Sequence, residues 1–598
     1  MPSNNIILKE GNDVINKPID VCNIFKKYYK SMADDIGEPD NFDGDVNERQ
    51  VNEALLCHND HPSVLKIKEV FPSLQVFKFS ETTSDMVLKH MKSLNVKKSC
   101  GYDEISPYFI KIAATGLAMP LSNLINYCFS NNVYPESFKL SETSPLYKAK
   151  DRFMKENYRP VSCPTVVSKV MEHQMSSQIA AHFKNIFHVK LSAFRNGISC
   201  EHVLINAVED WKRALDQNKI VGSLFMDLSK AFDCLPHKLL ISKLSAYGFS
   251  LDSCCLMASY LSGRKMRVKH YGYKSDWCQI TKGVPQGSVL GPTIYNIFVN
   301  DLLYDVGDYF YNYADDNSIA VIGDEIAQVF PKLKLNAEIC TKWFSQNMMR
   351  ANPDKFQFMV MSRKSNINLP KNITINNVTI DAVDDVKLLG VHIDAQFSFR
   401  KHVKNLCNKA SRNLNVIKKM SNRVHGKAER IALVDAMVTS QFTYCPLVWH
   451  FCPKLLDNLI SNIQKRCMRF VLNDYDYNSD FKDMLISCQK TTLFHLRLKK
   501  IALFMFRCFK ELNLKYLNEM FEHKEIIYSL RDSKRVHLKK YNTVRYGYQS
   551  LCYAGAKLWN TLPVHVKNSE NEKEFMNKLS SWKCLEPGCK KCAQFIYH

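Results

Sequence analysis

The spacing of apolar residues changes along the chain, and this change predicts a fold with both helices and strands. From residue 85 to residue 129, apolar side chains recur every three or four positions, which is the period of one helix face. Residues 100–103 (Cys-Gly-Tyr-Asp) interrupt this pattern as a turn. Between residues 141 and 164 the pattern predicts short strands and turns, whereas the first 80 residues are typical of polar helix and loop.

The centre of the chain contains the clearest strand patterns. Residues 220–227 form a mostly apolar run, which predicts a buried strand. Residues 309–322 predict a strand, a tight turn and a second strand. Residues 269–280 alternate weakly and predict a hairpin, and residues 387–393, followed by Phe397, are again strand-like.

Two helical regions follow. Residues 325–344 place apolar side chains on one face, which predicts an amphipathic helix, with Pro331 either kinking it or marking its start. Beyond Arg400 the pattern is helical and basic, so the chain as a whole is predicted to have an α+β fold with a mainly helical later part. The cations of the basic stretch are Lys401, Lys404, Lys409, Arg412, Lys418, Lys419, Arg423, Lys427 and Arg430.

The composition adds a charge signal to this picture. The 598 residues are 46% hydrophobic, which is enough for several cores and a few domains. Lys and Arg number 81 against 59 Asp and Glu, giving a net charge of +22. This excess favours a nucleic-acid partner, because each phosphate that is neutralised releases a counterion, although solubility alone would also account for it.

Several functional classes are disfavoured by what the sequence lacks. Residues 1–9 are too short and polar for the apolar part of a signal peptide, and no apolar run approaches the roughly 20 residues needed to span a bilayer. The 21 cysteines are scattered, which predicts reduced thiols and a nuclear or cytosolic setting. No phosphate-binding loop of the GxxxxGK[ST] type is present, so ATP is not an expected cofactor.

The first candidate for chemistry is Asp227, where the apolar strand is predicted to end. A carboxylate at a strand end can reach a metal ion in an open cleft. Taken alone, Asp227 is more simply explained as the N-cap of a following helix.

The second candidate is the pair Asp315 and Asp316, between apolar flanks at a predicted hairpin tip. Adjacent aspartates are also ordinary turn residues. Beside a third carboxylate, however, they would repel strongly unless cations lay between them. Two Mg²⁺ ions about 3.5–4 Å apart would relieve that repulsion and stabilise both the attacking and the leaving oxygen of an in-line displacement.

The third candidate is the segment GVPQGSVLGP at residues 283–292, which leads into an apolar helix. Its two glycines around Pro285 and Gln286 would allow the backbone to approach a nucleotide or template closely, although a plain loop before a core helix is equally consistent. The three features in this order, with a strand before Asp227 and a hairpin around Asp315, are far more specific than any one alone.

These segments resemble a known family. FMDLSKAFD (225–233), GVPQGSVLGP (283–292) and YADD (313–316) resemble motifs A, B and C of reverse transcriptases, specifically those of non-LTR (LINE-type, jockey-like) retrotransposons. The resemblance covers roughly residues 85–470. Its further segments are residues 98–103, 144–148, 157–162 and 192–199 for the fingers, 352–355 for motif D, 387–391 for the primer grip and 441–449 after the thumb.

The resemblance implies a role for each matching position. Asp227, Asp315 and Asp316 would hold Mg²⁺, and the backbone carbonyl of Leu228 would add a ligand. Lys355 would protonate the leaving pyrophosphate.

The remaining matches would contact the substrates. Lys148 and Arg159 would neutralise the incoming triphosphate, with surface cations as the alternative explanation. Phe232 would lie under the sugar and exclude a 2′-hydroxyl, with an ordinary core aromatic as the alternative. Gln286 and Gly287 would pack near the nascent pair and the template.

The fold that the resemblance implies is a right hand with fingers, a palm with an antiparallel sheet, and a helical thumb. The expected division is an N-terminal helical and loop extension (1–80), fingers and palm (81–395), a basic thumb (396–475) and a mostly helical C-terminal region (476–598). The implied reaction transfers deoxynucleotides from dNTPs to a primer 3′-hydroxyl on an RNA template, in the resembling elements on nicked chromosomal target DNA. Nuclear action follows from the resemblance alone.

Two rival functions remain open. An RNA-dependent RNA polymerase would share the palm and the metals, but a bulky Phe232 argues against it. A non-catalytic nucleic-acid-binding remnant is the other, because fewer than one hundred residues precede the matching region, too few for the endonuclease that such elements usually carry. The tail offers a weaker zinc hypothesis with free thiols as the alternative, on Cys584, Cys589, Cys592 and His598.

Overall fold

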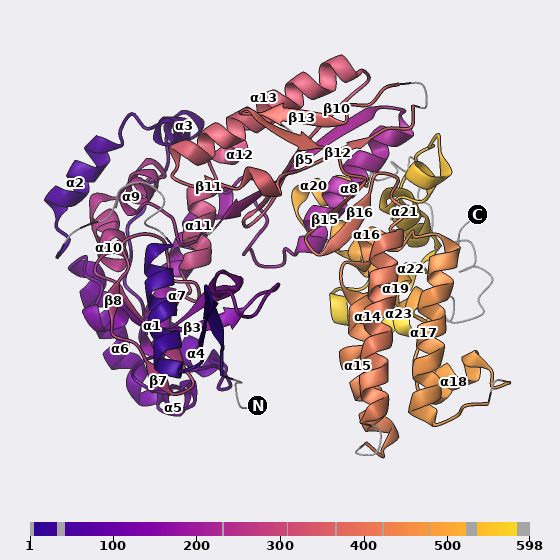
Figure 1. The fold of residues 1–598 in the computed structure, drawn as a ribbon, viewed down its shortest axis with the longest axis horizontal. Coiled ribbons are helices and arrows are strands. Elements are labelled where there is room, and N and C mark those ends of the chain that lie inside the picture. The colour runs from indigo at the N-terminus through magenta and orange to yellow at the C-terminus, as the bar shows by residue number, and fades with distance from the viewer. Residues whose placement is uncertain are drawn as a thin grey trace. The chain divides into compact units, whose positions relative to one another are not determined.

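The computed structural model describes most of the chain (Figure 1), which divides into two compact units. The first unit comprises residues 1–194, 227–308 and 338–353, and the second comprises residues 195–226, 309–337 and 354–598. Within the described residues no helix is long and apolar enough to cross a membrane. The described residues are 5–32, 42, 44–229, 232–307, 309–364, 367–420, 424–476, 478–521 and 535–582.

The first unit begins with a small hairpin and a helix that packs on a sheet. Phe25 and Tyr29 of α1 are buried against Val268 and Tyr158, so the polar N-terminal stretch still contributes an apolar helix face. The hairpin strands β1 and β2 were not predicted from the sequence. The bounds are β1 (Leu8–Glu10), β2 (Asp13–Ile15) and α1 (Pro18–Ser31).

A five-stranded sheet lies behind α1, with the strand order β4-β3-β6-β7 and β8 beside β6. Strand β3 pairs antiparallel with β4 and parallel with β6. The strands predicted at 141–164 and the hairpin predicted at 269–280 are both present. The bounds are β3 (Leu140–Tyr147), β4 (Tyr158–Pro164), β6 (Lys265–His270), β7 (Tyr273–Lys274) and β8 (Cys278–Gln279).

Helices make up the rest of the first unit. The helical pattern at 85–129 is confirmed as three helices, two of which begin at hydroxyl caps: Thr83 accepts from the amide of Met86, and Ser106 from that of Tyr108. The bounds are α2 (Glu48–Cys57), α3 (Pro62–Val70), α4 (Ser84–Ser93), α5 (Pro107–Ile112), α6 (Ala114–Ser130), α7 (Val166–His182), α9 (His237–Ala246), α10 (Leu251–Leu261), α11 (Gly291–Val299) and α12 (Leu302–Asp305).

A second five-stranded sheet has the order β11-β5-β10-β9, with β12 also paired to β5. Its centre is β5, whose apolar run includes Val221 and Leu224, both fully buried. Helix α13 runs through Pro331 without ending there, so the proline neither starts nor stops this helix. The bounds are β5 (Ile220–Ser229), β9 (Phe310–Tyr313), β10 (Asp316–Gly323), β11 (Arg350–Ala351), β12 (Gln357–Met361) and α13 (Ile326–Gln346).

The second unit is mainly helical after two further hairpins, as the sequence predicts. The strand-like pattern at 387–393 is a hairpin with a turn at Leu389 and Gly390, and Phe397 is buried beyond it rather than in a strand. The bounds are α8 (Cys200–Asp216), β13 (Asn372–Ile375), β14 (Val378–Asp381), β15 (Asp385–Leu388), β16 (Val391–Asp394), α14 (Arg400–Lys419), α15 (Lys427–Met437), α16 (Pro446–Trp449), α17 (Lys454–Leu472), α18 (Phe481–Ser487), α19 (Leu493–Phe509), α20 (Lys515–Asn518), α21 (Leu551–Thr561), α22 (Val564–Lys567) and α23 (Glu572–Ser581).

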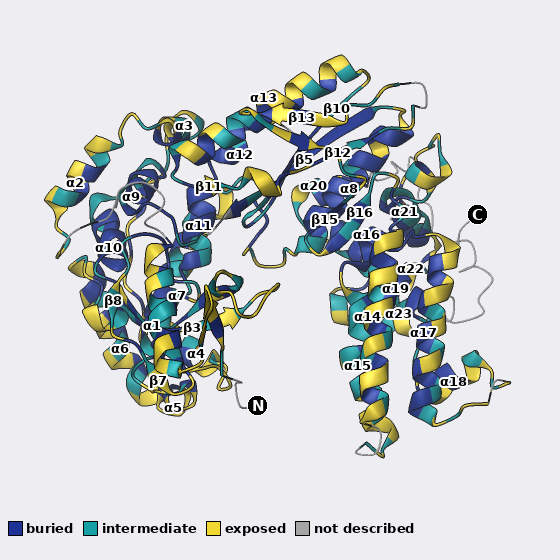
Figure 2. Cartoon of the chain, viewed as in Figure 1, coloured by how far each residue is buried: buried dark blue, intermediate teal, exposed yellow. Residues whose placement is uncertain are grey.

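Helix α8 connects the parts of the second unit and is almost wholly buried (Figure 2). Three of its carboxylates accept backbone N–H groups from the C-terminal half of the chain. Glu201 accepts from Leu447 at 3.0 Å, and Glu209 accepts at 2.9 Å from both Leu551 and Cys552 at the start of α21. Asp216 accepts from the amides of residues 542 and 543. Residues 535–582 are therefore built into the same core as α14 and α17.

Candidate active site

Asp227 lies inside strand β5 rather than at its end. The strand continues to Ser229, so Asp227 is not the N-cap of a helix, and the predicted strand end was two residues too early. The Asp227 side chain is half-buried, and its backbone carbonyl accepts from the amide of Asn352 at 3.3 Å. Leu228 is buried and pairs with Ala351.

The strand partners of β5 change around Asp227. Strand β12 pairs with residues 221–225, and β11 pairs with residues 228 and 229. The chain between these two partners forms a short 3-10 helix, Pro353–Lys355. The side chain of Lys355 is exposed on this segment.

Asp315 and Asp316 lie at the turn between β9 and β10, as predicted. Tyr313 pairs with Asp316, which leaves Ala314 and Asp315 as a two-residue loop. Both carboxylates are half-buried. Ala314 has a φ of 56°, in the left-handed region that residues other than glycine rarely adopt. Tight hairpins need such a residue, so an alanine here carries backbone strain that the surroundings must hold in place.

Two buried asparagines hold this turn, and sequence reasoning missed them. The side-chain amide of Asn312 donates to the carbonyl of Ala314 at 3.1 Å and to the side-chain oxygen of Asn317 at 2.8 Å. The amide of Asn317 donates to the carbonyl of Asp315 at 3.3 Å. The two residues face each other across the strand pair and are 2% and 3% exposed. The sequence did contain a signal for this pair: Asn312 and Asn317 flank the YADD segment (313–316) directly, at positions that the predicted hairpin places opposite each other.

The loop at residues 283–287 is fastened to two other segments of the first unit. The amide of Val284 donates to the carbonyl of Phe232 at 2.9 Å, and the amide of Gly283 donates to Leu235 at 2.9 Å. The carbonyl of Gln286 accepts from the amide of Ser162 on β4 at 2.8 Å. The loop is therefore held between β4 and the segment that follows β5.

The two glycines of this loop are required by the chain's own backbone. A Cβ on Gly283 would lie 2.5 Å from the carbonyl carbon of Asp233, and one on Gly287 would lie 2.2 Å from the carbonyl oxygen of Ser162. Both residues also have positive φ, 76° and 129°. The two glycines thus allow segments of this protein to approach each other closely. This is in addition to the predicted close approach of a nucleotide.

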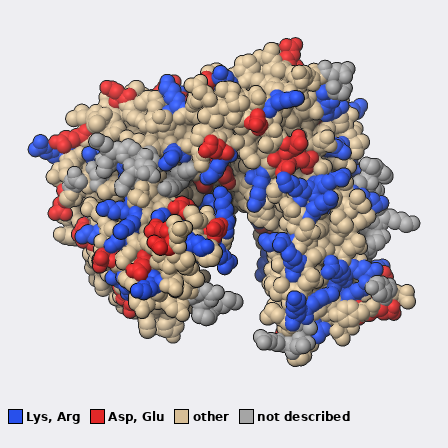
Figure 3. All heavy atoms as spheres, viewed as in Figure 1, with Lys and Arg blue, Asp and Glu red and all other residues tan. Residues whose placement is uncertain are grey.

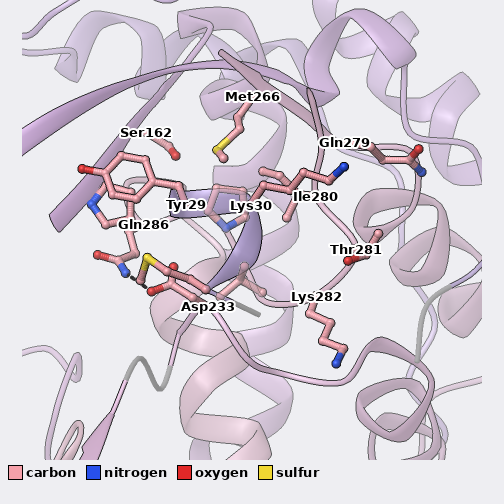
Figure 4. Close-up of a pocket in the computed structure, with 14 residues that line it drawn as sticks. Tyr29, Lys30, Ser162, Asp233, Met266, Gln279, Ile280, Thr281, Lys282 and Gln286 are labelled. Atoms are coloured by element: carbon pink, nitrogen blue, oxygen red, sulfur yellow. Dashed lines mark hydrogen bonds between the residues drawn. The ribbon is translucent and has the colours of Figure 1, made fainter. Parts of the chain in front are cut away.

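A small cavity of about 50 Å³ lies beside this loop, entirely within the first unit (Figure 4). Its wall includes Tyr29 of α1, Ser162 of β4, and Asp233 and Gln286. The side-chain amide of Gln286 donates to the Asp233 carboxylate at 2.7 Å, which fixes how the glutamine side chain lies. Asp233 therefore orients Gln286, a role that the resemblance to motif A did not give it.

Glu172 on α7 fixes the far end of the same loop. It is fully buried, and its carboxylate accepts the amides of Val289 and Leu290 just before α11, at 2.5 and 3.2 Å. Burial raises the pKa of this carboxyl, while the two amides act in the opposite direction. Sequence reasoning missed Glu172, because a single glutamate in a helix gives no sign of a partner more than one hundred residues away.

Phe232 is packed between two other rings of the first unit. It stacks on Tyr295 of α11 with ring centroids 4.6 Å apart, and Phe194 meets it edge-on at 5.7 Å. The ring is half-buried, so one part remains accessible. Both the predicted sugar contact and an ordinary packing role are compatible with this position.

Lys148 and Arg159 lie on one hairpin of the first unit, β3–β4. Arg159 pairs with Leu146 across the hairpin, and the amide of Lys148 donates to the carbonyl of Asn157. Both side chains are exposed, and in the described part of the chain neither shows an ion pair. Alternation along a strand places Lys148 on the same face as Leu146, and hence beside Arg159.

Residues 147–393 match the family of reverse transcriptases (RNA-dependent DNA polymerases). This segment is a reverse transcriptase domain. It contains each of the nine predicted active-site and substrate residues together with Leu228.

Relatives of the chain are named as proteins of mobile elements. It is 25% identical over 399 residues to a probable RNA-directed DNA polymerase from transposon BS of Drosophila melanogaster, covering 64% of this chain and 44% of the relative. A Pol polyprotein of the type-1 retrotransposable element R1 of Bradysia coprophila is 24% identical, covering 76% and 44%. The RNA-directed DNA polymerase of the jockey element of Drosophila melanogaster is 24% identical, covering 55% and 37%.

These similarities confirm the predicted resemblance to LINE-type, non-LTR reverse transcriptases. The chain spans less than half the length of the relatives named above. The reverse transcriptase domain itself begins within β3 and ends within β16, so α1 to α6 and the helices from α14 onward lie outside the family match.

Across the described ranges, no group of three or more His, Cys, Asp and Glu side chains is arranged to hold a metal ion. The structure places Asp227 in the first unit and Asp315 and Asp316 in the second, so their convergence stays a prediction. The zinc hypothesis on Cys584, Cys589, Cys592 and His598 lies outside the described residues.

The close packing of Gly287, in the loop at residues 283–287, predicts the effect of a substitution on stability. We expect Gly287→Ala to destabilise the protein by roughly 2–4 kcal/mol, because the new Cβ meets the Ser162 carbonyl and the backbone is strained. Gly272→Ala is the matched control: its φ is 84°, but nothing lies within 4 Å of the added carbon, so about 1 kcal/mol is expected. Urea denaturation of both variants measures the difference, and equal destabilisation would contradict the close packing.

Proposed function

We propose that this protein is an RNA-directed DNA polymerase that extends a primer 3′-hydroxyl with dNTPs on an RNA template. The observation that supports this most is the reverse transcriptase domain itself, which holds the three predicted metal-binding aspartates at a strand and at a hairpin turn. Nine predicted active-site and substrate residues, from Lys148 to Lys355, fall within that one domain.

In this proposal the elements form the parts of a right hand. The sheet β4-β3-β6-β7 and its helices belong to the fingers, and the sheet β11-β5-β10-β9 to the palm. Helices α14, α15 and α17 belong to the thumb, within the predicted range 396–475. The predicted ranges 1–80, 81–395 and 476–598 complete the division.

The chemistry of the aspartates suits a hard divalent cation. Asp227, Asp315 and Asp316 offer only carboxylate oxygens, the ligands that Mg²⁺ prefers, and the Leu228 carbonyl would add another. Two Mg²⁺ ions bound there would stabilise charge on the attacking and leaving oxygens. The protein's own part is to hold the carboxylates in fixed positions, and the side-chain amides of Asn312 and Asn317 hold the turn that carries Asp315 and Asp316.

The substrate side chains have complementary tasks. Lys148 and Arg159, both exposed on one hairpin, would neutralise the triphosphate of the incoming dNTP. Gln286, oriented by Asp233, and Gly287 would contact the nascent base pair and the template strand. Lys355, exposed on its short helix, would supply a proton to the leaving pyrophosphate.

The thumb supplies a basic surface for the template–primer duplex. Helix α14 contains seven Lys and Arg and no Asp or Glu. Its Lys404, Lys409 and Arg412 are exposed, while Val403, Ala410 and Leu414 are buried. Figure 3 shows Lys and Arg gathered over the helices of this region. Such contacts track phosphates without reading sequence, so they would serve both an RNA template and a DNA primer or target.

Sugar selection tests the polymerase proposal against its rival, an RNA-dependent RNA polymerase. On an RNA template with Mg²⁺ we expect dNTPs to be incorporated far more efficiently than NTPs. Phe232→Val should raise the relative use of NTPs roughly 10- to 100-fold, because the ring that would meet the 2′-hydroxyl is shortened.

The readout is primer extension with each nucleotide set. Phe71→Val, another half-buried aromatic of the first unit outside the motifs, is the control for general loss of packing. Equal use of NTPs and dNTPs by the intact protein would favour the RNA polymerase instead.

A further inference from the structure

Two cysteines of the second unit lie side by side although 245 residues separate them in sequence. The Sγ atoms of Cys200 and Cys445 are 3.9 Å apart, and both thiols are free. Cys200 is half-buried at the first position of α8, and Cys445 is 4% exposed just before α16. A disulfide bond needs sulfurs about 2.05 Å apart, so a movement of roughly 2 Å would join them.

The surroundings of the pair favour reaction at Cys200. The hydroxyl of Tyr444 lies 3.2 Å from the Cys200 sulfur. The hydrogen bond from Cys445 is the main cause that lowers the pKa of Cys200 to about 6, against burial, which raises it. The start of a 17-residue helix also favours a thiolate, whereas the nearby carboxylate of Glu201 disfavours one. The hydrogen bond with Cys200 and then burial raise the pKa of Cys445, so this thiol stays protonated.

The pair also contacts parts of the second unit that carry predicted function. The Tyr444 hydroxyl donates to the carbonyl of Leu389 at 2.6 Å, in the turn between β15 and β16. Tyr313, two residues before Asp315, has its pKa raised by burial and then by the two neighbouring thiols. Through Tyr444 the pair therefore lies next to the predicted primer grip, residues 387–391.

We propose that Cys200 and Cys445 form a peroxide-reactive dithiol that closes to an intramolecular disulfide. The Cys200 thiolate attacks one peroxide oxygen, the O–O bond breaks, and hydroxide leaves and is protonated to water. The sulfur of Cys445 then attacks the Cys200 sulfenic acid, its proton goes to the departing hydroxide, and a second water forms. The dithiol loses two electrons and one hydrogen peroxide gains them.

The full chain, reduced and then treated with one equivalent of hydrogen peroxide, provides the test. After alkylation of the remaining thiols, peptide mapping by mass spectrometry without reduction should find a peptide linking Cys200 to Cys445 as the main product. In Cys445→Ser, Cys200 should instead be trapped as a sulfenic acid by dimedone. Cys278→Ser is the control, because Cys278 has comparable exposure in the first unit and burial raises its pKa.

A second readout on the unmodified protein does not depend on any variant folding. At pH 6 iodoacetamide should alkylate Cys200 about ten times faster than an ordinary thiol, after allowing for the lower nucleophilicity of a more acidic thiolate. The proposal is overturned if Cys200 reacts no faster than Cys278, or if peroxide links other cysteines while Cys200 and Cys445 stay unlinked. Neither readout requires polymerase activity, so this proposal can fail independently of the proposed function.

Discussion

Replacing Asp315 by asparagine is expected to lower primer extension at least about 1000-fold while leaving nucleic-acid binding unchanged. Losing a carboxylate that holds a metal ion removes several kcal/mol of transition-state stabilisation, and about 4 kcal/mol corresponds to that factor. Asparagine has the same shape and leaves the backbone carbonyl of Asp315 available to Asn317, so the turn itself should persist. Primer extension and filter binding on the same RNA–DNA substrate measure the two quantities.

Asp324→Asn is the matched control for this experiment. Asp324 is exposed and follows the end of β10 that is far from the turn. The control therefore removes one negative charge from the same hairpin without changing the turn that carries Asp315. If Asp315→Asn retains extension within tenfold of the unmodified protein, the assignment of Asp315 as a metal ligand is wrong. If the unmodified protein binds the duplex but never extends it, the non-catalytic remnant is the better explanation.

A chain that ends at residue 534 is expected not to fold its second unit. The lost segment contributes rings to the core: Trp559 stacks on Phe509 at 4.4 Å, and Phe575 stacks on Phe506 at 4.5 Å. Nine buried apolar side chains of the described part of this segment are lost. The eight that are larger than alanine, at roughly 1.5–3 kcal/mol each, contribute about 12–24 kcal/mol, as much as or more than the 5–15 kcal/mol that holds a typical domain together. The nine are Val536, Leu551, Ala556, Leu558, Trp559, Leu562, Val566, Phe575 and Leu579.

Circular dichroism and thermal denaturation of two truncated chains test this. The control ends at residue 582 and keeps every residue that the structure describes, so its unfolding temperature should match that of the full chain. Unchanged helix content and an unchanged transition in the chain ending at 534 would show that the C-terminal segment is a separate appendage.

The sequence predicted elements well where a local pattern decides them. The apolar run of β5 and the hairpin around Asp315 were both predicted. A strand buried on both faces has a continuous apolar sequence, and a tight turn has polar residues between two apolar segments. The end of β5 was missed, because a half-buried aspartate inside a strand looks like a strand end. Pro331 was weighed as a helix start, yet α13 runs through it at the cost of one backbone hydrogen bond.

Contacts between distant segments could not be predicted in this way. Glu172 accepts a backbone N–H group from the loop before α11, and Glu209 accepts one from the start of α21. The sequence around each glutamate contains no pattern that indicates these partners. The glycine at 287 was explained by an approaching nucleotide, whereas the nearest obstacle is the carbonyl of Ser162. The sequence motifs predicted the site residues, whereas the residues that position them became evident only from their packing in the structure.

The carboxylates of α8 also bear on how the chain folds as it is made. Asp216 leaves the ribosome 326 residues before Asn542, the residue whose amide it accepts. At about 5–20 residues per second, this separation corresponds to roughly 15–65 s of synthesis. Throughout that interval the Asp216 carboxylate is hydrated instead of bonded to backbone amides, and this part of the second unit can close only after residues 542 and 543 have been made.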